Sequence, residues 1–496
     1  MDERSHDIDV MLQDGLDDLP QDISHGVTPW RRAMNLCLAG IALNTLTLNF
    51  LLLNYILPTA GLIMMLLGFR SLRRENALFR LCFIISAVRI MFLIPSLALN
   101  ATVYADVVYD SPAYYTLSVI NMILLLLMFF FLRFALLEVQ QKAGLPPRAK
   151  GTVALIVWYF ILILLALINY KGIIIGIIMI VAYICIIRSL VNMSHTLDAA
   201  GYALNAAPVR IPGAVLVAGI VVIIAAGITC GYIFGSSYPM AWSPSDSSEH
   251  DNIADIKSHL TELGFPADIL DDIAADDLAP CADAVAVVVN IEDHSVNDGR
   301  VVTTQTGNRF HSETVYDVKE LHFTSVAVRL PGEWEIWRVF HHFIWTVDPD
   351  YRGTEALRIN SQVQDLWMRQ CEVTGRILYD ENGVTYTSPY HFLGKKTYTY
   401  SSMFWGEITM TNTLASFSLP DGGSHHRGYV SFTVSAISSM GAILESSVEY
   451  MHQTSWMNYP AETAIDKFFS GYNPYDGTFK RAEAQLMFYP HDEYKE

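Results

Sequence analysis

The sequence predicts an α-helical polytopic membrane bundle of about seven helices, followed by an extracytoplasmic, mainly-β domain arranged as a sandwich or jelly roll. Three observations lead to this fold class. Hydrophobic residues make up 52% of the 496 residues and charged residues only 17%, which is apolar for a soluble protein. The long apolar runs all lie before residue 236, and segments rich in Val, Ile, Thr and aromatic residues follow residue 283. The charge changes sign at the same boundary.

Charge is distributed unevenly along the chain. Residues 1–30 have a net charge of −7, residues 31–235 of +9 and residues 236–496 of −20. Such asymmetry indicates segments that face different environments. Residues 1–33 are interpreted as an acidic cytoplasmic tail, because a signal peptide would begin with basic residues. An acidic chain without a basic stripe argues against a nucleic-acid partner.

Seven apolar runs predict the membrane bundle, residues 34–235. They cover about residues 34–52, 55–70, 79–98, 115–137, 152–169, 172–189 and 213–234, and a span of ~30 Å of hydrocarbon needs ~20 residues. The first two runs are short, so one long bent helix, and six helices in total, is the alternative. Gly172–Gly176 and Gly227–Gly231 fit GxxxG, a pattern that permits close helix packing.

The basic residues predict an orientation for the bundle. Twelve Lys and Arg fall in the segments assigned to one side, and only Lys171 falls in the short loops of the other side. An excess of Lys and Arg marks cytoplasmic loops. We therefore expect a multi-pass protein of the plasma membrane. With seven helices its N-terminus is cytoplasmic, and with either count residues 236–496 lie outside the cytoplasm.

Arg89 is the candidate functional residue within the bundle. It lies nine residues after Arg80, which places it near mid-bilayer at ~1.5 Å per residue. A charge at this depth is unfavourable and marks a functional site by default. The structural alternative is an arginine that satisfies carbonyls or Asn side chains of the bundle. No Asp or Glu lies at a matching depth in another run, which weakens the case for a proton-coupled carrier.

Two short segments separate the bundle from the strands. Residues 236–251 form a linker rich in Ser, Pro and Asp, and residues 252–282 form a small acidic helical module. The module shows helical spacing of its apolar residues. Its aspartates are Asp271, Asp272, Asp276 and Asp277. We expect them to form a solvated acidic face rather than a cation site, because their spacing does not match a calcium-binding loop.

Residues 283–496 predict the β-rich domain. About eight strand-like segments alternate with turn signals, and a short helix is expected at residues 460–469. The aromatic stretch 334–347 is interpreted as a central strand whose odd-numbered residues face the core and whose even-numbered face is half covered. Its Trp337 and Trp345, with Trp405, are also candidates for an aromatic face that binds sugar rings. Filling of the core is the favoured interpretation.

Histidine and cysteine supply the remaining candidate sites. Twelve of the 15 histidines lie after residue 235. The candidate metal ligands are His341, His342, His425, His426 and His452. Adjacent residues of a strand point to opposite faces, so a metal site would need one histidine from each adjacent pair and a third ligand. Cys281 and Cys371 either form one disulfide or remain two reduced thiols, and spacing does not decide between these.

The leading hypothesis is an integral membrane protein that presents a β-rich extracytoplasmic domain for binding or sensing at the cell surface. Its partners would be the lipid bilayer and an extracytoplasmic ligand or protein of unknown identity. No catalytic motif such as HExxH or GxSxG is present, so no catalytic residue and no cofactor are assigned. A transporter or transport-complex subunit is the alternative, and an envelope-facing enzyme, with or without a metal, is the second alternative.

Overall fold

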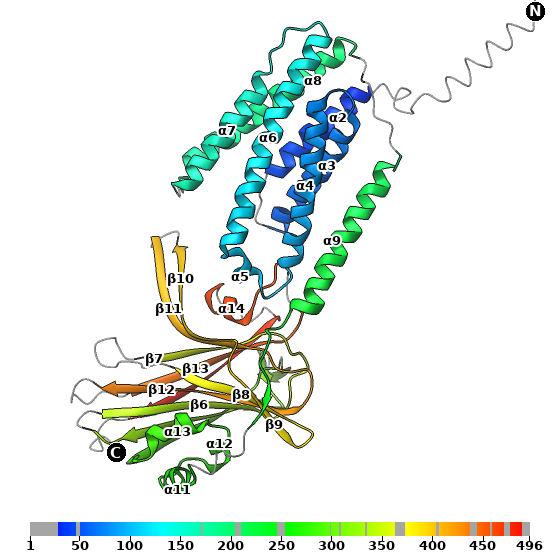
Figure 1. Cartoon of the computed structure of the whole chain (residues 1–496). Helices are drawn as coiled ribbons and strands as arrows, with labels where there is room; N and C mark the ends of the chain where they lie inside the picture. The colour runs from blue at the N-terminus through cyan, green and yellow to red at the C-terminus, as the bar shows by residue number, and fades with distance from the viewer. Residues whose placement is uncertain are drawn as a thin grey trace, which may run out of the picture. The chain divides into compact units, whose positions relative to one another are not determined.

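In the computed structural model the chain folds into two compact units, one helical and one β-rich (Figure 1). The helical unit extends to Gly231, and the β-rich unit contains the chain from Tyr232 onward together with Ala101–Val103. The structure describes residues 28–45, 50–168, 170, 172–202, 204, 210–245, 253–297, 299–306, 309–332, 335–362, 373–402, 406–436, 444–456, 459–470 and 477–488.

The helical unit contains seven long helices and one short one among the described residues. They are α2 (Pro29–Thr45), α3 (Leu53–Leu72), α4 (Ala77–Leu99), α5 (Ala105–Tyr109), α6 (Pro112–Lys142), α7 (Lys150–Leu167), α8 (Ile173–Ala199) and α9 (Gly213–Gly235). Six of these, α3, α4, α6, α7, α8 and α9, are long and apolar enough to cross a membrane. They are the helices of a multi-pass membrane protein.

The predicted count of seven spanning helices is therefore wrong, and the reason lies in α2. Helix α2 has only 17 residues, and its sequence includes Arg31, Arg32 and two asparagines, so it is shorter and more polar than a typical spanning helix. The proposed single bent helix is not found either, because α2 packs antiparallel to α3. A Cβ atom on Gly61 would lie 2.6 Å from the backbone nitrogen of Asn44, and one on Gly68 would lie 2.7 Å from the carbonyl of Ala33. Glycine permits this close approach of two backbones.

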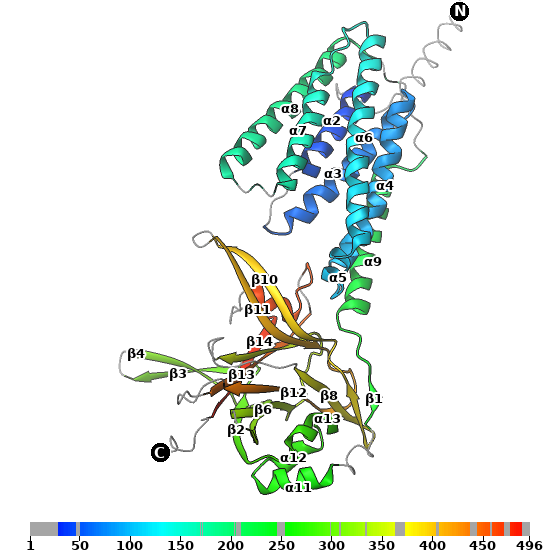
Figure 2. The same cartoon turned by 60° about the vertical axis from the view of Figure 1, so that its left-hand side comes forward.

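The long helices other than α9 form a ring. Each packs on the next in the order α2, α3, α4, α6, α7, α8, and α8 packs back on α2 (Figure 2). Helix α9 contacts the outside of α3 and α4, since Gly213 lies near Leu67 and Gly227 near Ala98. The GxxxG prediction pointed to other glycines than those that pack closely. A Cβ on Gly176 would meet nothing within 4 Å, and one on Gly227 would make only ordinary contact at 3.5 Å.

The β-rich unit consists of antiparallel sheets. The seven-stranded sheet has the order β1 (Ser243–Pro244), β9 (Val384–Ser388), β8 (Thr374–Glu381), β12 (Ser424–Ala436), β6 (Glu335–Trp345), β5 (Leu321–Leu330) and β2 (Ala286–His294). The five-stranded sheet has the order β10 (Phe392–Ser402), β11 (Gly406–Phe417), β7 (Glu355–Gln362), β13 (Leu444–Gln453) and β14 (Phe479–Phe488). A separate hairpin pairs β3 (Arg300–Thr306) with β4 (Arg309–Val315). The sequence predicted strands within residues 284–291, 321–330, 334–347, 372–379, 383–390, 398–412, 414–419 and 428–437. Strands β1, β3, β4, β7 and β13 lie outside these segments.

The two large sheets share one hydrophobic core. Trp337, Val339 and Phe343 of β6 pack with Leu357 of β7 and Tyr450 of β13. These β6 residues are odd-numbered, as the alternation along the strand predicts. On the far side of the five-stranded sheet lies α14 (Ala464–Ser470), the helix predicted at residues 460–469, whose Ala464 and Ile465 pack on that sheet.

The acidic helical module covers the other face of the seven-stranded sheet. It comprises α11 (Ala254–Glu262), α12 (Ala267–Leu270), α13 (Ala275–Leu278) and the 3₁₀ turn η1 (Ala279–Cys281). Leu260, Phe265 and Leu278 of the module pack with Phe340 of β6 and Tyr429 of β12. The even-numbered face of β6 is therefore covered by helices, and module and sheet form one folded body.

Candidate functional site

Asp272, at the end of α12, joins the helical module to the sheet. Its Oδ2 lies 2.9 Å from Nε2 of His342, and its Oδ1 accepts a hydrogen bond of 2.7 Å from Nε of Arg427. Its backbone carbonyl accepts a further bond of 3.0 Å from Nε of Arg376. Burial acts to raise the pKa of Asp272, but the interactions with His342 and Arg427 outweigh it and hold this pKa below its ordinary value.

Asp277, in α13, makes a second buried link to the same sheet. Its Oδ1 accepts hydrogen bonds from Nη2 of Arg338 at 2.8 Å and from the hydroxyl of Thr374 at 2.5 Å. Its Oδ2 accepts one from the hydroxyl of Tyr429 at 2.6 Å. Burial, with Asp277 nearby, raises the pKa of Tyr429, so the phenol remains a donor at all ordinary pH values.

The aspartates of the module are therefore of two kinds, and the expectation of one solvated acidic face is wrong for two of them. Asp272 and Asp277 are each only 7% exposed, because they turn toward the basic side chains of the sheet. Asp271 and Asp276 are exposed. Their basic partners lie on β6 and β12 and hold the module on the sheet. These partners are Arg338, His342 and Arg427.

A pocket of about 520 Å³ opens beside the Asp272–Arg427 pair. Its lining residues are Ser245, Asp271, Asp272, Gly383, Val384, Thr385 and Arg427. The volume lies within the ~300–1,000 Å³ typical of small-molecule sites. Arg427 is held in place by Asp272, by Asp380 at 3.0 Å and by the carbonyl of His425 at 2.9 Å. These contacts use Nε and Nη1, and Nη2 bonds to no residue that the structure describes.

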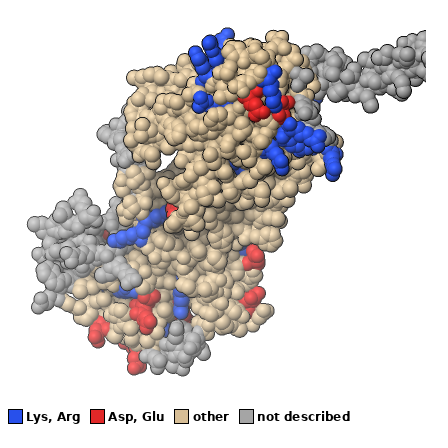
Figure 3. Space-filling model, turned by 45° about the horizontal axis from the view of Figure 1, so that its top comes forward, with Lys and Arg blue, Asp and Glu red and all other residues tan. Residues whose placement is uncertain are grey.

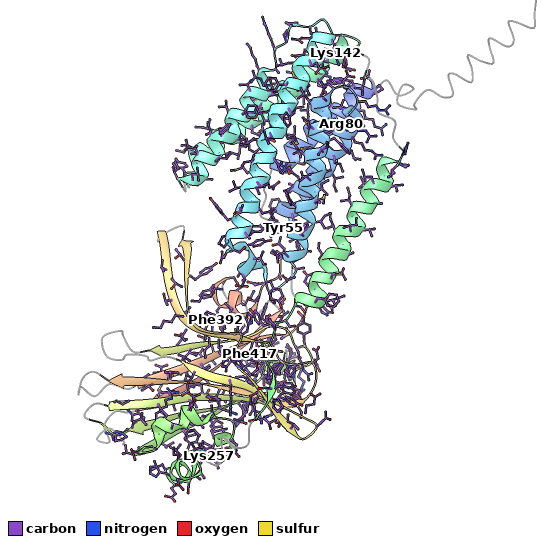
Figure 4. The ribbon with its side chains drawn as sticks, in the orientation of Figure 1. Tyr55, Arg80, Lys142, Lys257, Phe392 and Phe417 are labelled. Carbon is purple, nitrogen blue, oxygen red and sulfur yellow. The ribbon has the colours of Figure 1, made fainter. Side chains whose placement is uncertain are left out.

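Asp271 supplies an acidic group to the same pocket. Its Oδ1 pairs with Nζ of Lys257 at 2.6 Å, and its side chain is 79% exposed. Lys257 lies on α11 in the helical module (Figure 4). The pocket thus combines a rigid guanidinium with an accessible carboxylate, and a bound molecule would find an anion-binding and a cation-binding group within one cavity.

The candidate metal ligands each have a separate partner. His341 lies between the hydroxyls of Ser325 and Ser446, His342 is paired with Asp272, and His426 with Asp348 at 2.6 Å. His425 lies 3.4 Å from Asp380, and His452 lies 2.8 Å from Glu355. The described part of the chain contains no group of three or more His, Cys, Asp or Glu residues placed to hold a metal ion. The structure does not bring the predicted combination together.

The tryptophans of β6 belong to the core. Trp337 and Trp345 are each 2% exposed, and Nε1 of Trp345 donates to the hydroxyl of Tyr450 at 3.2 Å. Rings packed in this way have no face available to a sugar, so these two residues form no aromatic binding surface. Trp405 lies outside the described residues.

The two cysteines proposed to pair are described only in part. Cys281, in η1, is a buried free thiol, and burial raises its pKa to about 12. Such a thiol is protonated and unreactive at neutral pH. Cys371 lies outside the described residues.

Arg89 lies within the helical ring, at the middle of α4. It is 6% exposed, and its Nε donates to Oδ1 of Asn121 in α6 at 3.0 Å. An Asn side chain thus satisfies part of the guanidinium, as the structural alternative expects. Nη1 of Arg89, however, is buried without a hydrogen-bond partner. Nη1 of Arg70 and Nε of Arg133 are also buried without a partner, but of these three arginines Arg89 lies nearest the middle of its helix.

Basic side chains gather at one end of the helical unit. Arg80 and Lys142 lie at this end, and Tyr55 lies toward the opposite end (Figure 4). A space-filling view shows the same concentration of Lys and Arg at the top (Figure 3). Segregation of this kind is the structural counterpart of the charge bias between the loops.

Sequence reasoning singled out Asp271 and Asp272 of the pocket but missed the basic residues that hold the aspartates of the module. Arg427, which lines the pocket, and Arg338, which pairs with Asp277, were given no functional interpretation, although each is a charged residue within a strand. A buried strand position with a charge needs a partner. The acidic module was the available source of that partner, and this pairing was the signal that could have located the site.

Comparison with known proteins adds little to this picture. No protein-family model matches the chain, and no curated protein matches it. The chain is similar to a solved structure described as "Pore forming protein", with 9% identity and a TM-score of 0.16 over 38% of this chain and 96% of that chain. At that TM-score the similarity carries no argument about fold or activity.

Proposed function

We propose that the chain is an integral membrane protein that presents its β-rich unit outside the cytoplasm to bind a small polar ligand. The observation that carries this proposal is the pocket beside Arg427 and Asp272. Ion pairs hold the guanidinium of Arg427 in a fixed position. A polar group that is already fixed in place costs less conformational entropy when a ligand binds. The six spanning helices would anchor the unit in the bilayer and connect it to the other side.

The pocket favours a ligand that carries both charges. Nη2 of Arg427 is available to a carboxylate, and Asp271, with Lys257 as its single described ion-pair partner, is available to an ammonium group. Arg recognises carboxylates through paired N–H donors. A zwitterion of amino-acid size fits this combination of charges and the volume of about 520 Å³.

A panel of small zwitterions should raise the thermal unfolding midpoint of the purified full-length protein, because ligand binds only the folded state. Matched molecules that lack the ammonium or the carboxylate should give little effect. Asp271→Asn should weaken binding by roughly tenfold, the equivalent of about 1.4 kcal/mol. Asp276→Asn, an exposed neighbour outside the pocket, is the matched control and should bind as the unchanged protein does. Equal binding by both variants would contradict the assignment of the pocket.

The orientation is a separate part of the proposal. Arg and Lys concentrate at the end of the bundle that holds Arg80 and Lys142, and this end is expected to be cytoplasmic. The chain leaves α9 at Gly235, which is at the opposite end from Arg210 and its basic neighbours.

A tag placed after Glu496 should therefore be accessible to antibody in intact cells, without permeabilisation. A tag placed before Met1 tests the number of spans. With six spans it should be accessible in intact cells like the C-terminal tag, and with seven it should be accessible only after permeabilisation. Exposure of the C-terminal tag only after permeabilisation would place the β-rich unit in the cytoplasm and overturn this orientation.

A further inference from the structure

The interior of the helical ring contains a polar cluster drawn from five helices. Arg89 of α4 contacts Asn121 of α6 at 3.0 Å and interacts electrostatically with Tyr159 of α7. The hydroxyls of Tyr159 and Tyr183, from α7 and α8, lie 2.6 and 2.9 Å from the hydroxyl of Thr45, the last residue of α2. Arg89 is 6% exposed, and these side chains contact one another across different helices, so the cluster lies between the helices rather than facing lipid.

Among the described residues of the helical unit, none supplies a counter-charge to Arg89 within this interior. Five acidic residues lie in the described helical segments. Glu75 and Glu138 pair with Lys142 at the end of the bundle that holds Arg80, and Asp198 accepts a hydrogen bond from Thr28. Asp106 and Asp110 lie in and beside α5, between the spans. A buried cation without a partner is strongly unfavourable in hydrocarbon, so such residues mark ligand sites.

The geometry points to an anion as the missing partner. We propose that an oxyanion group, a carboxylate or phosphate, binds inside the ring against Nη1 of Arg89 and the amide nitrogen of Asn121. Nη1 of Arg89 is buried and unpartnered. Because Oδ1 of Asn121 accepts from Nε of Arg89, the amide nitrogen of Asn121 is left as a second donor. A site that offers donors and a guanidinium, with no carboxylate beside it, selects an oxyanion over a cation. This inference is independent of the pocket in the β-rich unit.

Two sources of the oxyanion are possible, the headgroup of an anionic lipid and a free anion from water, and the test separates them. The full-length protein is placed in nanodiscs of phosphatidylcholine, and unfolding is followed by intrinsic fluorescence. In one arm sodium phosphate replaces sodium chloride at constant ionic strength. In the other arm phosphatidylglycerol replaces part of the phosphatidylcholine. Binding should raise the midpoint by roughly 2–5 °C in the arm that supplies the ligand.

Three variants make the result specific. Arg80→Gln removes the same charge from the exposed start of α4 and should respond as the unchanged protein does. Arg89→Gln should lose the response. Asn121→Asp places a carboxylate 3.0 Å from Nε of Arg89, so it should raise the midpoint without added anion and abolish the response to it.

The two arms of the experiment distinguish the two sources of the oxyanion. A response confined to phosphatidylglycerol identifies a lipid headgroup, and a response to phosphate identifies a soluble anion. No response of the unchanged protein in either arm overturns the proposal. An undiminished response in Asn121→Asp also overturns it, even where Arg89→Gln cannot be purified in folded form.

Discussion

Asp277→Asn is expected to destabilise the β-rich unit by about 3–5 kcal/mol, because it removes one member of a buried ion pair and leaves the other unpaired. Arg338 is 7% exposed, and Asp277 is its ion-pair partner at 2.8 Å. The amide also replaces an acceptor that serves the hydroxyls of Thr374 and Tyr429. The thermal midpoint of the purified full-length protein should fall by on the order of 10 °C.

Asp276→Asn is the matched control, since Asp276 is the adjacent residue of α13 and is exposed. It should leave the midpoint nearly unchanged. A double variant, Asp277→Leu with Arg338→Met, removes both charges and should recover much of the lost stability, as replacement of a whole buried pair by apolar residues often does. Equal midpoints for Asp277→Asn and Asp276→Asn would show that the buried link does not hold the module on the sheet.

The parts of the fold that sequence predicted are those set by local patterns. Apolar runs located the spanning helices, and alternation along β6 placed Trp337, Val339 and Phe343 in the core. The apolar runs and the alternation are each complete within one segment of the chain, so they can be recognised without knowing which distant residues are in contact. Strands β7 and β13 were missed because their residues are polar at many positions. They include Glu355, Asn360 and Glu449, which bond to side chains on neighbouring strands rather than to solvent.

The candidate site was not predicted because its members meet only in the folded chain. Asp272 reaches His342 across 70 residues and Arg427 across 155. No spacing rule connects positions so far apart, and acidic residues on a short helix are usually solvated. The glycines that the sequence pattern selected are also not the ones that bring two helices close together. GxxxG selects glycines four residues apart, whereas Gly61 and Gly68, which pack closely on α2, are seven residues apart in α3. Arg89 was singled out from sequence because its expected depth in the bilayer follows from counting residues along one helix.

Acid should destabilise the β-rich unit through His341, and replacing this residue should reduce the sensitivity. Burial lowers the pKa of His341 to about 3, against an ordinary value of 6.5. Between these values the unfolded chain holds a proton on His341 that the folded chain does not. Stability is therefore lost as pH falls from about 6.5 toward 3, by up to about 1.4 kcal/mol per pH unit. His341→Gln retains a donor and an acceptor for Ser325 and Ser446 but removes the titrating ring.

The measurement is the thermal midpoint of the full-length protein between pH 7 and pH 4, compared between variants. The comparison is needed because Glu355 acts in the opposite direction. Burial raises the pKa of Glu355 despite its contact with His452, so its contribution is lost as pH rises above the ordinary carboxyl range. That effect is common to all variants and cancels in the difference. His311→Gln, an exposed change on β4, should keep the full acid sensitivity. If His341→Gln loses stability as steeply as His311→Gln, the imidazole between the two serines is not the group that responds to acid.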